Sequence, residues 1–468
     1  MPLNSANQDS GRGWPAAFAG LLPLLLLLLA FAAGIQVPFW LYLLVLAWSL
    51  TWPLFRARPG RAAVIDGGHP AVHDAPIPGH SVTHQREILH RLADAIDPTI
   101  LEIAGQELTA TGLVLRGDLH ARPEDVQRHV AERAESLTGR RAQVMIHEED
   151  DGRVSVLIPH ADFERLLLAA VPPRRPLVNI ALLVATLATT TFAGAAHQGI
   201  NLFDQPEAWT AGLPYGIGVM LILGVHEMGH YLTARYHGVP VSLPYFIPVP
   251  FALGTFGAFI RLPPLLKARR QLFDIGVAGP LAGLAVAIPA LALGLQRSTV
   301  LPVEAAGAAT AHMAQGVSVN ASILFALVSK AAIGESLTTG HYVVLHPLAF
   351  AGWLGLMITA LNLLPVGQLD GGHIAHALFG RRRAQTVGNA TLMALVGLGL
   401  FVWTGLLFWA LVVFFIAGRP GMPPMEDVTP LDPRRRALAW SSFALLALIL
   451  LPLPHAISPE IGLHCPYV

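Results

Sequence analysis

Long apolar runs, separated by short polar segments, dominate this chain. A span of the hydrocarbon core needs ~20 mostly apolar residues. The run at 386–418 is too long for one span, and we interpret it as a tight hairpin that turns near 403–405. The pattern predicts a polytopic α-helical membrane protein with nine spans, or eight if that run is one bent helix. The apolar runs are 15–33, 38–55, 177–196, 212–235, 273–295, 347–365, 386–418 and 437–454.

One polar region interrupts this pattern. Alternating runs at 111–119, 141–149 and 152–160 predict strands. The stretch 122–139 predicts a helix, because it has Pro123 near its start, acids in its first turn and a glycine just past its end. We expect a small α/β domain inserted between spans. The domains are 1–55, two N-terminal spans; 56–80, a linker; 81–175, the soluble domain; 176–420, the membrane core; and 421–468, a last span and tail.

Composition agrees with a membrane protein. Charged residues are only 13% of the chain, against roughly 25% in soluble domains. Basic and acidic residues are equal at 30 each, so no charge bias points to nucleic acid. The single cysteine, Cys465, can form neither a disulfide framework nor a cysteine-based metal site. Any metal must therefore be bound by His, Asp or Glu.

Basic residues give an orientation. In the nine-span arrangement they cluster on one side, which the positive-inside rule identifies as the cytosol. The soluble domain lies on that side as well. The first run, preceded by Arg12 and followed by small residues, also fits a signal peptide. The basic residues that fall together are Arg56, Arg58, Arg61, Arg174, Arg175, Arg235, Lys267, Arg269, Arg270, Arg381, Arg382, Arg383, Arg434, Arg435 and Arg436.

The span at 212–235 contains the sequence HEMGH. In a helix, His226 and His230 lie on one face about one turn apart and can bind one zinc ion, with Glu227 as general base. The motif also occurs by chance, and polar residues can join helices. A charge at mid-bilayer costs at least ~2.5–3.5 kcal/mol, however, so three ionisable residues in five positions favour a functional site.

A catalytic zinc needs a third protein ligand and one open position. Asp370 follows the span at 347–365, which delivers it to the depth of His226 and His230. Glycines at 367, 371 and 372 allow the backbone to bend, although Asp-Gly is also an ordinary turn dipeptide. Three rivals stay open: His373 and His376 lie beyond the turn, and Asp274 is better explained as the capping acid of the span at 273–295.

These residues resemble the site-2 protease family of intramembrane zinc metalloproteases. The two signatures are HEMGH at 226–230 and NLLPVGQLDGG at 362–372, in this order and both in membrane context. The chain is most similar to the plastid and cyanobacterial branch, whose members carry a soluble domain before the membrane core. The similarity covers about 180–420 well and extends through 254–260, 273–284 and 346–356.

The resemblance implies a role for each matched residue. His226, His230 and Asp370 would bind one Zn²⁺ per chain, Glu227 would activate water, and Asn362 would support the substrate backbone or the oxyanion. The proline- and glycine-rich stretch 241–264 would be a membrane-embedded hairpin beside the active site, although a plain interfacial loop is the alternative. An extended substrate would add as a strand to the edge formed by Gly254, Thr255, Phe256, Gly257, Ala258 and Phe259.

The implied function is hydrolysis of membrane-protein substrates within or near a transmembrane segment. The expected partners are those substrates and the lipid bilayer, without nucleic acid, and the oligomeric state stays open. A metal-ion transporter with the same His/Asp cluster and an inactive scaffold of the same fold are the alternatives. We expect a bacterial inner membrane, because no transit-peptide composition precedes the first span.

Overall fold

The computed structural model describes residues 82–451 apart from ten gaps. The expected spans at 15–33 and 38–55, and the linker, lie outside the described residues. The chain divides into two compact units: the described part of one is 394–416, and the other comprises 77–393 and 417–468. The gaps are 110, 140–141, 150–151, 161–174, 264–265, 303–321, 335–340, 402–404, 418–420 and 422.

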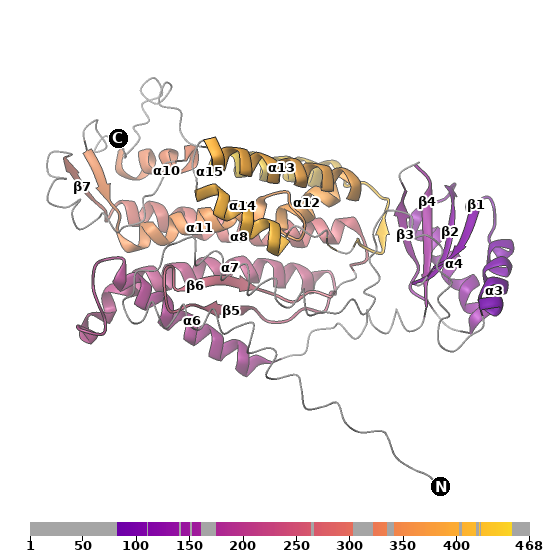
Figure 1. The fold of residues 1–468 in the computed structure, drawn as a ribbon, viewed down its shortest axis with the longest axis horizontal. Coiled ribbons are helices and arrows are strands. Elements are labelled where there is room, and N and C mark those ends of the chain that lie inside the picture. Colours follow the sequence, from indigo (N-terminus) through magenta and orange to yellow (C-terminus); the bar gives the residue numbers. More distant parts are fainter. Residues whose placement is uncertain are drawn as a thin grey trace, which may run out of the picture. The chain divides into compact units, whose positions relative to one another are not determined.

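The soluble domain is a sheet with two helices packed on it (Figure 1). Its strands alternate between buried and exposed residues, and the buried side chains meet those of the helices in a core that includes Leu92, Leu115, Val130 and Ile146. The sheet order is β1-β2-β4-β3-β9, antiparallel except for the parallel pair β3 and β9. The elements are α3 (Val82–Ala95), β1 (Leu101–Leu108), β2 (Gly112–Leu119), α4 (Pro123–Thr138), β3 (Met145–Glu148), β4 (Val154–Pro159) and β9 (Glu426–Asp427).

Helix α4 and strands β2, β3 and β4 confirm the predicted elements of this domain. Pro123 occupies the first turn of α4, and Gly139 ends the helix in a left-handed conformation with φ 67°. Three elements were not predicted: α3, β1 and β9. Strand β9 comes from the far end of the sequence, where a two-residue strand has no detectable alternation.

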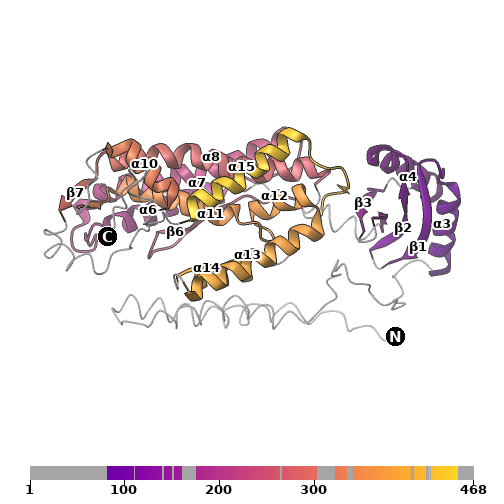
Figure 2. The ribbon, with the colours of Figure 1, turned by 90° about the horizontal axis from the view of Figure 1, so that it is seen from above.

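Four apolar helices form the centre of the membrane core: α6 (Pro176–Ala196), α7 (Leu213–Tyr236), α8 (Arg269–Leu295) and α11 (Pro347–Leu363). Helices α7, α8 and α11 pack against one another, and α6 packs against α7 (Figure 2). Within the described part of the chain, three helices are long and apolar enough to cross a membrane: α6, α8, and Pro206–Tyr236, which includes α7. Small residues permit this close packing.

A β-hairpin lies inside the membrane core, where the sequence predicted one. Strands β5 (Tyr245–Pro248) and β6 (Thr255–Phe259) are antiparallel. Helix α6 holds both ends: Asn179 Nδ2 donates to the Pro244 carbonyl at 2.7 Å, and Thr189 Oγ1 donates to the Gly254 carbonyl at 2.7 Å. Strand β5 packs on α6, and the two-stranded sheet ends at β6.

The long run at 386–418 is two helices, α13 (Arg381–Phe401) and α14 (Gly405–Ala417). A Cβ added to Gly399 would lie 2.9 Å from the backbone nitrogen of Leu407. In a continuous helix these residues would be ~12 Å apart along the axis, so the chain reverses direction between them. The expected turn, at 403–405, coincides with the undescribed residues 402–404 and the start of α14.

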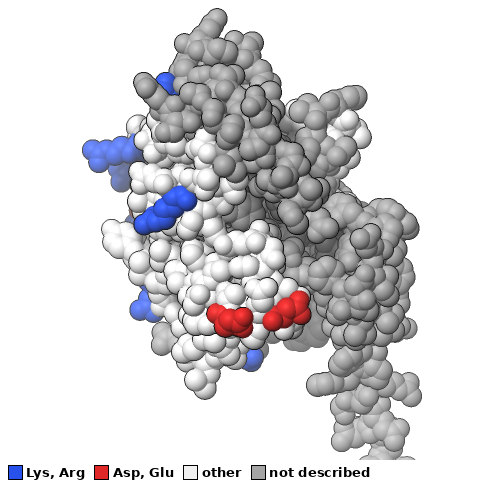
Figure 3. Space-filling model, turned by 90° about the vertical axis from the view of Figure 1, so that its left-hand side faces the viewer, with Lys and Arg blue, Asp and Glu red and all other residues white. Residues whose placement is uncertain are grey.

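The remaining elements complete the core. Helix α10 contacts α8 and α15, and helix α12 contacts α8, α11 and α15. Strands β7 and β8 pair antiparallel, and the described surface seen from that end is largely uncharged (Figure 3). The elements are the 3-10 helix Pro206–Gly212, β7 (Thr299–Pro302), α10 (Ile323–Ile333), β8 (His341–Val344), α12 (Asp370–Phe379) and α15 (Pro433–Leu450).

Candidate metal centre

Helix α7 presents two imidazoles at one point. His226 and His230 are 3% and 6% exposed, and their Nε2 atoms are 3.2 Å apart. The four-residue spacing places both rings on one face of the helix. The sequence expectation for this pair follows directly from helical periodicity.

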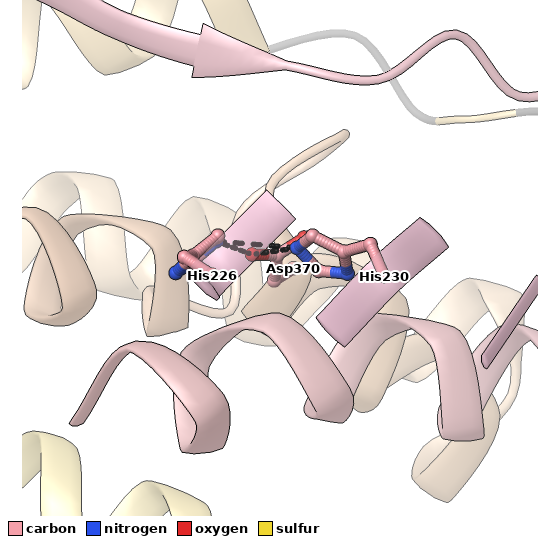
Figure 4. Close-up of side chains that lie close together, drawn as sticks. All are labelled: His226, His230 and Asp370. Carbon is pink, nitrogen blue, oxygen red and sulfur yellow. Dashed lines mark hydrogen bonds and ion pairs between the residues drawn. The ribbon is translucent and has the colours of Figure 1, made fainter. Parts of the chain in front are cut away.

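The third side chain is Asp370, the first residue of α12. Its Oδ2 lies 3.3 Å from Nε2 of His226 and 3.2 Å from Nε2 of His230. All three side chains point toward one another (Figure 4). Asp370 is therefore not an ordinary turn residue, since it begins a helix and faces the histidines.

The backbone turn before α12 places Asp370 beside the two histidines. Helix α11 ends at Leu363, and Gly367 has a φ of 50°, in the left-handed region. A Cβ on Gly371 would lie 2.0 Å from the Leu363 carbonyl oxygen, and one on Gly372 would lie 2.3 Å from the Gly367 carbonyl oxygen. These contacts exclude any larger residue, which explains the glycines around Asp370.

The donor set fits a zinc ion. Nδ1 of His230 lies 2.7 Å from the Ile275 carbonyl and donates to it, so Nε2 carries the lone pair in the neutral ring. Two imidazole nitrogens and a carboxylate oxygen lie within 3.3 Å of one another, an arrangement that a bound cation would satisfy. Tetrahedral zinc with bonds of ~2.0–2.1 Å would place its ligand atoms ~3.3–3.4 Å apart.

Three glycines of α8 make room for this centre. A Cβ on Gly279 would lie 2.1 Å from Nε2 of His230, and one on Gly283 would lie 3.1 Å from Nδ1 of His226. A Cβ on Gly276 would lie 3.3 Å from the Asp370 carbonyl oxygen. Sequence reasoning did not assign these glycines a role, although their helical spacing on one face was a usable signal.

Glu227 lies beside the histidines and is 5% exposed. The backbone amide of Ile260, the residue that follows β6, faces its carboxylate. Nδ2 of Asn362, on α11, lies 3.3 Å from Nε2 of His226. The structure thus brings Glu227, Asn362 and the end of β6 to the three-residue cluster.

The residues expected at the substrate edge divide into two groups. Gly254 and Thr255 are buried: Gly254 packs directly on α6, and Thr255 Oγ1 donates to the Ile247 carbonyl. Phe256 and Phe259 are 67% and 44% exposed. Gly257 and Ala258 are half-buried.

The rival ligands lie elsewhere. His376 Nε2 lies 2.9 Å from Oδ2 of Asp427. Asp274 is in the second turn of α8, which begins at Arg269, so the expectation that it caps this helix is wrong. It pairs instead with Arg435 at 2.7 Å and with His237 at 2.9 Å. His373 packs beside Gly276 of α8, outside the three-residue cluster.

The chain is similar to known proteins. Residues 215–405 match Peptidase family M50. Probable zinc metalloprotease EGY2, chloroplastic, of Arabidopsis thaliana is 29% identical over 76% of this chain and 62% of its own length. The EGY1 proteins of Arabidopsis thaliana and Oryza sativa subsp. japonica, both also named chloroplastic, are 38% and 31% identical over 54% and 75% of this chain. No solved structure matches.

These matches confirm the resemblance to the site-2 protease family and to its plastid branch. The chain spans 62%, 45% and 64% of the lengths of the three relatives. The expectation of a bacterial inner membrane is contradicted, because the relatives are named chloroplastic, which points to a plastid membrane. That expectation rested on the composition before the first span, which does not identify a membrane, and the positive-inside rule distinguishes only the two sides of a membrane.

Proposed function

We propose, from the premise that residues 215–405 form a Peptidase family M50 domain, that the chain is an intramembrane zinc metalloendopeptidase. Its substrates are membrane proteins, cut within or near a transmembrane segment. The observation that carries the proposal is the convergence of His226, His230 and Asp370 on one point, with the carboxylate of Glu227 beside them. The relatives named as probable zinc metalloproteases support zinc as the metal.

One zinc ion per chain would be bound by Nε2 of His226, Nε2 of His230 and Oδ2 of Asp370. A zinc ion bound there would supply Lewis-acid chemistry toward water and the scissile carbonyl. Three protein ligands leave one position open for these reactants, which is the arrangement of catalytic zinc sites. The Ile275 carbonyl orients the ring of His230 by accepting from its Nδ1.

Glu227 is the general base. Its carboxylate accepts a proton from the attacking water and returns a proton to the leaving amine nitrogen. The Ile260 amide faces this carboxylate. Asn362, whose amide lies next to His226, donates to the carbonyl oxygen of the scissile bond or to the substrate backbone.

Strand β6 would receive the substrate. Peptide bonds in a helix are hidden by their own hydrogen bonds, so a transmembrane substrate must unwind before cleavage. An extended segment can add to the edge of β6 that pairs with no described strand through backbone hydrogen bonds, and Phe256 and Phe259 are exposed to contact its side chains. Because β6 leads directly to Ile260 and Glu227, a strand added there lies beside the base.

The surrounding protein would be a polytopic membrane core of eight or nine spans, with the soluble domain on the side of the basic residues. The helices α6, α7 and α8 support the central spans. The lipid bilayer covers their apolar outer faces, where side chains such as Ile180, Ile217 and Leu293 are 57%, 53% and 48% exposed. Irregular backbone such as the β5–β6 hairpin is tolerated at membrane depth when protein buries it or a wet cavity adjoins it.

The test is the isosteric variant Glu227→Gln, compared with Glu207→Gln, which changes an exposed glutamate in the 3-10 helix Pro206–Gly212. Both are co-expressed with a single-span substrate. We expect Glu227→Gln to retain zinc and lose cleavage, and Glu207→Gln to retain both. Full cleavage by Glu227→Gln would exclude the proposed mechanism. Zinc flux through proteoliposomes without proteolysis would instead favour a transporter, although the described residues contain no second cluster of metal-binding side chains.

A further inference from the structure

Strand β9 connects the soluble domain to the membrane core. On one side it pairs with β3, where the Ile146 amide donates to the Met425 carbonyl at 2.6 Å. On the other side it pairs with the segment that leads into α8: the Met425 amide donates to the Leu266 carbonyl at 2.7 Å, and the Glu426 amide donates to the Lys267 carbonyl at 3.0 Å. Both edges of this strand are therefore occupied.

Asp427, on β9, makes a buried ionic contact with two helices of the core. It is 3% exposed. Its Oδ1 accepts from Nε of Arg269, the first residue of α8, at 2.7 Å, and its Oδ2 lies 2.9 Å from Nε2 of His376 on α12. Removing one member of a buried charged pair is strongly destabilising, because it leaves its partner as an uncompensated buried charge. The contact therefore favours the arrangement in which Asp427 meets both helices.

Arg269 also packs against the C-terminal end of α12. Gly380 follows this helix with a φ of 81°, and a Cβ there would lie 3.2 Å from Nη2 of Arg269. The guanidinium therefore packs against the end of α12 while its Nε binds Asp427. His376 and Gly380 together place the C-terminal half of α12 against the Arg269–Asp427 pair.

Asp370 occupies the opposite end of the same helix. Helix α12 has ten residues, so it is ~15 Å long, and its hydrogen-bonded backbone moves as one body. A shift at His376 is thus transmitted to the carboxylate of Asp370. A metal centre is sensitive to such shifts, because residues that orient ligands typically change metal affinity 10–100-fold when they are altered.

We propose that Asp427 is a positioning residue: it fixes α12 through His376, sets the place of the Asp370 carboxylate, and thereby couples the metal centre to the sheet of the soluble domain. The inference deepens the proposed function, since it concerns the same metal centre. It assigns the soluble domain a role in setting metal affinity. Coupling of this kind is reciprocal, so zinc binding must in turn stabilise β9.

The first experiment compares Asp427→Asn with Glu426→Gln in the full-length chain. Both remove a buried carboxylate from β9, but among the described residues the Glu426 carboxylate bonds to the amides of Val428 and Thr429 in the adjoining turn and to no core helix. We expect Asp427→Asn to weaken zinc binding about tenfold in a chelator competition, and Glu426→Gln to leave it unchanged. Equal effects of the two variants, or no effect of either, would overturn the proposal.

The second experiment measures amide exchange with and without zinc. Zinc should slow exchange in α12 and β9 of the wild type, and Asp427→Asn should remove the effect at β9 while leaving α3 and β1 unchanged. Faster exchange throughout Asp427→Asn would make Asp427 a residue of general stability and would overturn the proposal. The conservative variant His376→Gln, which can still donate to Asp427, should retain near-normal zinc affinity.

These measurements do not depend on proteolysis. If Glu227→Gln cleaves normally, the proposed mechanism fails while the zinc affinity of Asp427→Asn still tests the coupling. If Asp427→Asn binds zinc as tightly as the wild type, the coupling fails while cleavage by the wild type still supports the proposed function.

Discussion

Gly279 of α8 lies directly against the imidazole of His230 on α7, so closely that a Cβ would be 2.1 Å from Nε2. No real Cβ contact is this short, so even alanine would displace the ring. A Cβ on Gly276 or Gly283 would make a tight contact as well, at 3.3 Å from the Asp370 carbonyl oxygen and 3.1 Å from Nδ1 of His226. The absence of side chains on one face of α8 is thus part of the metal centre.

The first prediction concerns this contact. We expect Gly279→Ala to move His230 and to weaken zinc binding at least about tenfold, as measured by chelator competition. The matched control is Gly224→Ala on α7, because a Cβ at 224 would make only an ordinary contact, at 3.9 Å from Phe246. Normal zinc affinity of Gly279→Ala would show that the contact with Gly279 does not set the position of His230.

The second prediction separates substrate binding from metal binding. Gly254 has a φ of 79°, and a Cβ there would lie 2.5 Å from Cα of Thr190 on α6. We expect Gly254→Ala to displace the β5–β6 hairpin, to lower kcat/KM about tenfold or more, and to leave zinc content normal. Ala252→Gly, at an exposed position of the same turn where φ is 52°, should cleave normally. Zinc loss in Gly254→Ala would show that this position affects metal binding as well as substrate binding.

The third prediction concerns metal removal. Chelation should lower the melting temperature of the wild type, because His226, His230 and Asp370 then face one another without a cation. Zinc at 100 times its Kd would contribute about 2.7 kcal/mol to the free energy of unfolding. His226→Ala should respond little to chelation or to added zinc. An equal response of this variant would place the stabilising zinc at another site.

The fourth prediction is a pH dependence at Asp427. Burial opposes its ionisation, but the hydrogen bond with His376 and the charge of Arg269 outweigh burial and hold the pKa of Asp427 below its usual range. His147 of β3 is the other titratable group that faces it. A lowered folded-state pKa contributes stability above the ordinary aspartate pKa of about 3.9, and this contribution is lost as pH falls through the folded value.

The measurement compares thermal unfolding of the zinc-free wild type with that of Asp427→Asn between pH 6 and pH 3. The wild type should be the more stable protein above about pH 4, and the difference should shrink below that pH as Asp427 becomes protonated. Glu426→Gln retains Asp427, so its thermal stability should still show the part of the pH dependence that comes from Asp427. A difference that is constant over the whole range would show that the charge of Asp427 is not responsible.

The sequence predicted the parts of this protein that depend on neighbours along the chain. The pair His226 and His230 follows from helical periodicity, and α4 follows from its terminal signals. The prolines and glycines of 241–264 exclude a normal span, and the family resemblance implied the hairpin that β5 and β6 form. Asp370 was found through its distant motif and its expected membrane depth, and the structure brings it within 3.3 Å of both histidines.

Only the tertiary structure decided which residues support this centre. Gly279 faces His230 because α8 packs on α7, and Asp427 reaches His376 because a strand from the end of the chain joins the soluble sheet. Nothing local marks either contact: a glycine in an apolar helix and an acid in a short polar linker are both ordinary. The sequence thus determines the ligands, two through their helical spacing and Asp370 through its distant motif, whereas long-range packing determines what holds them.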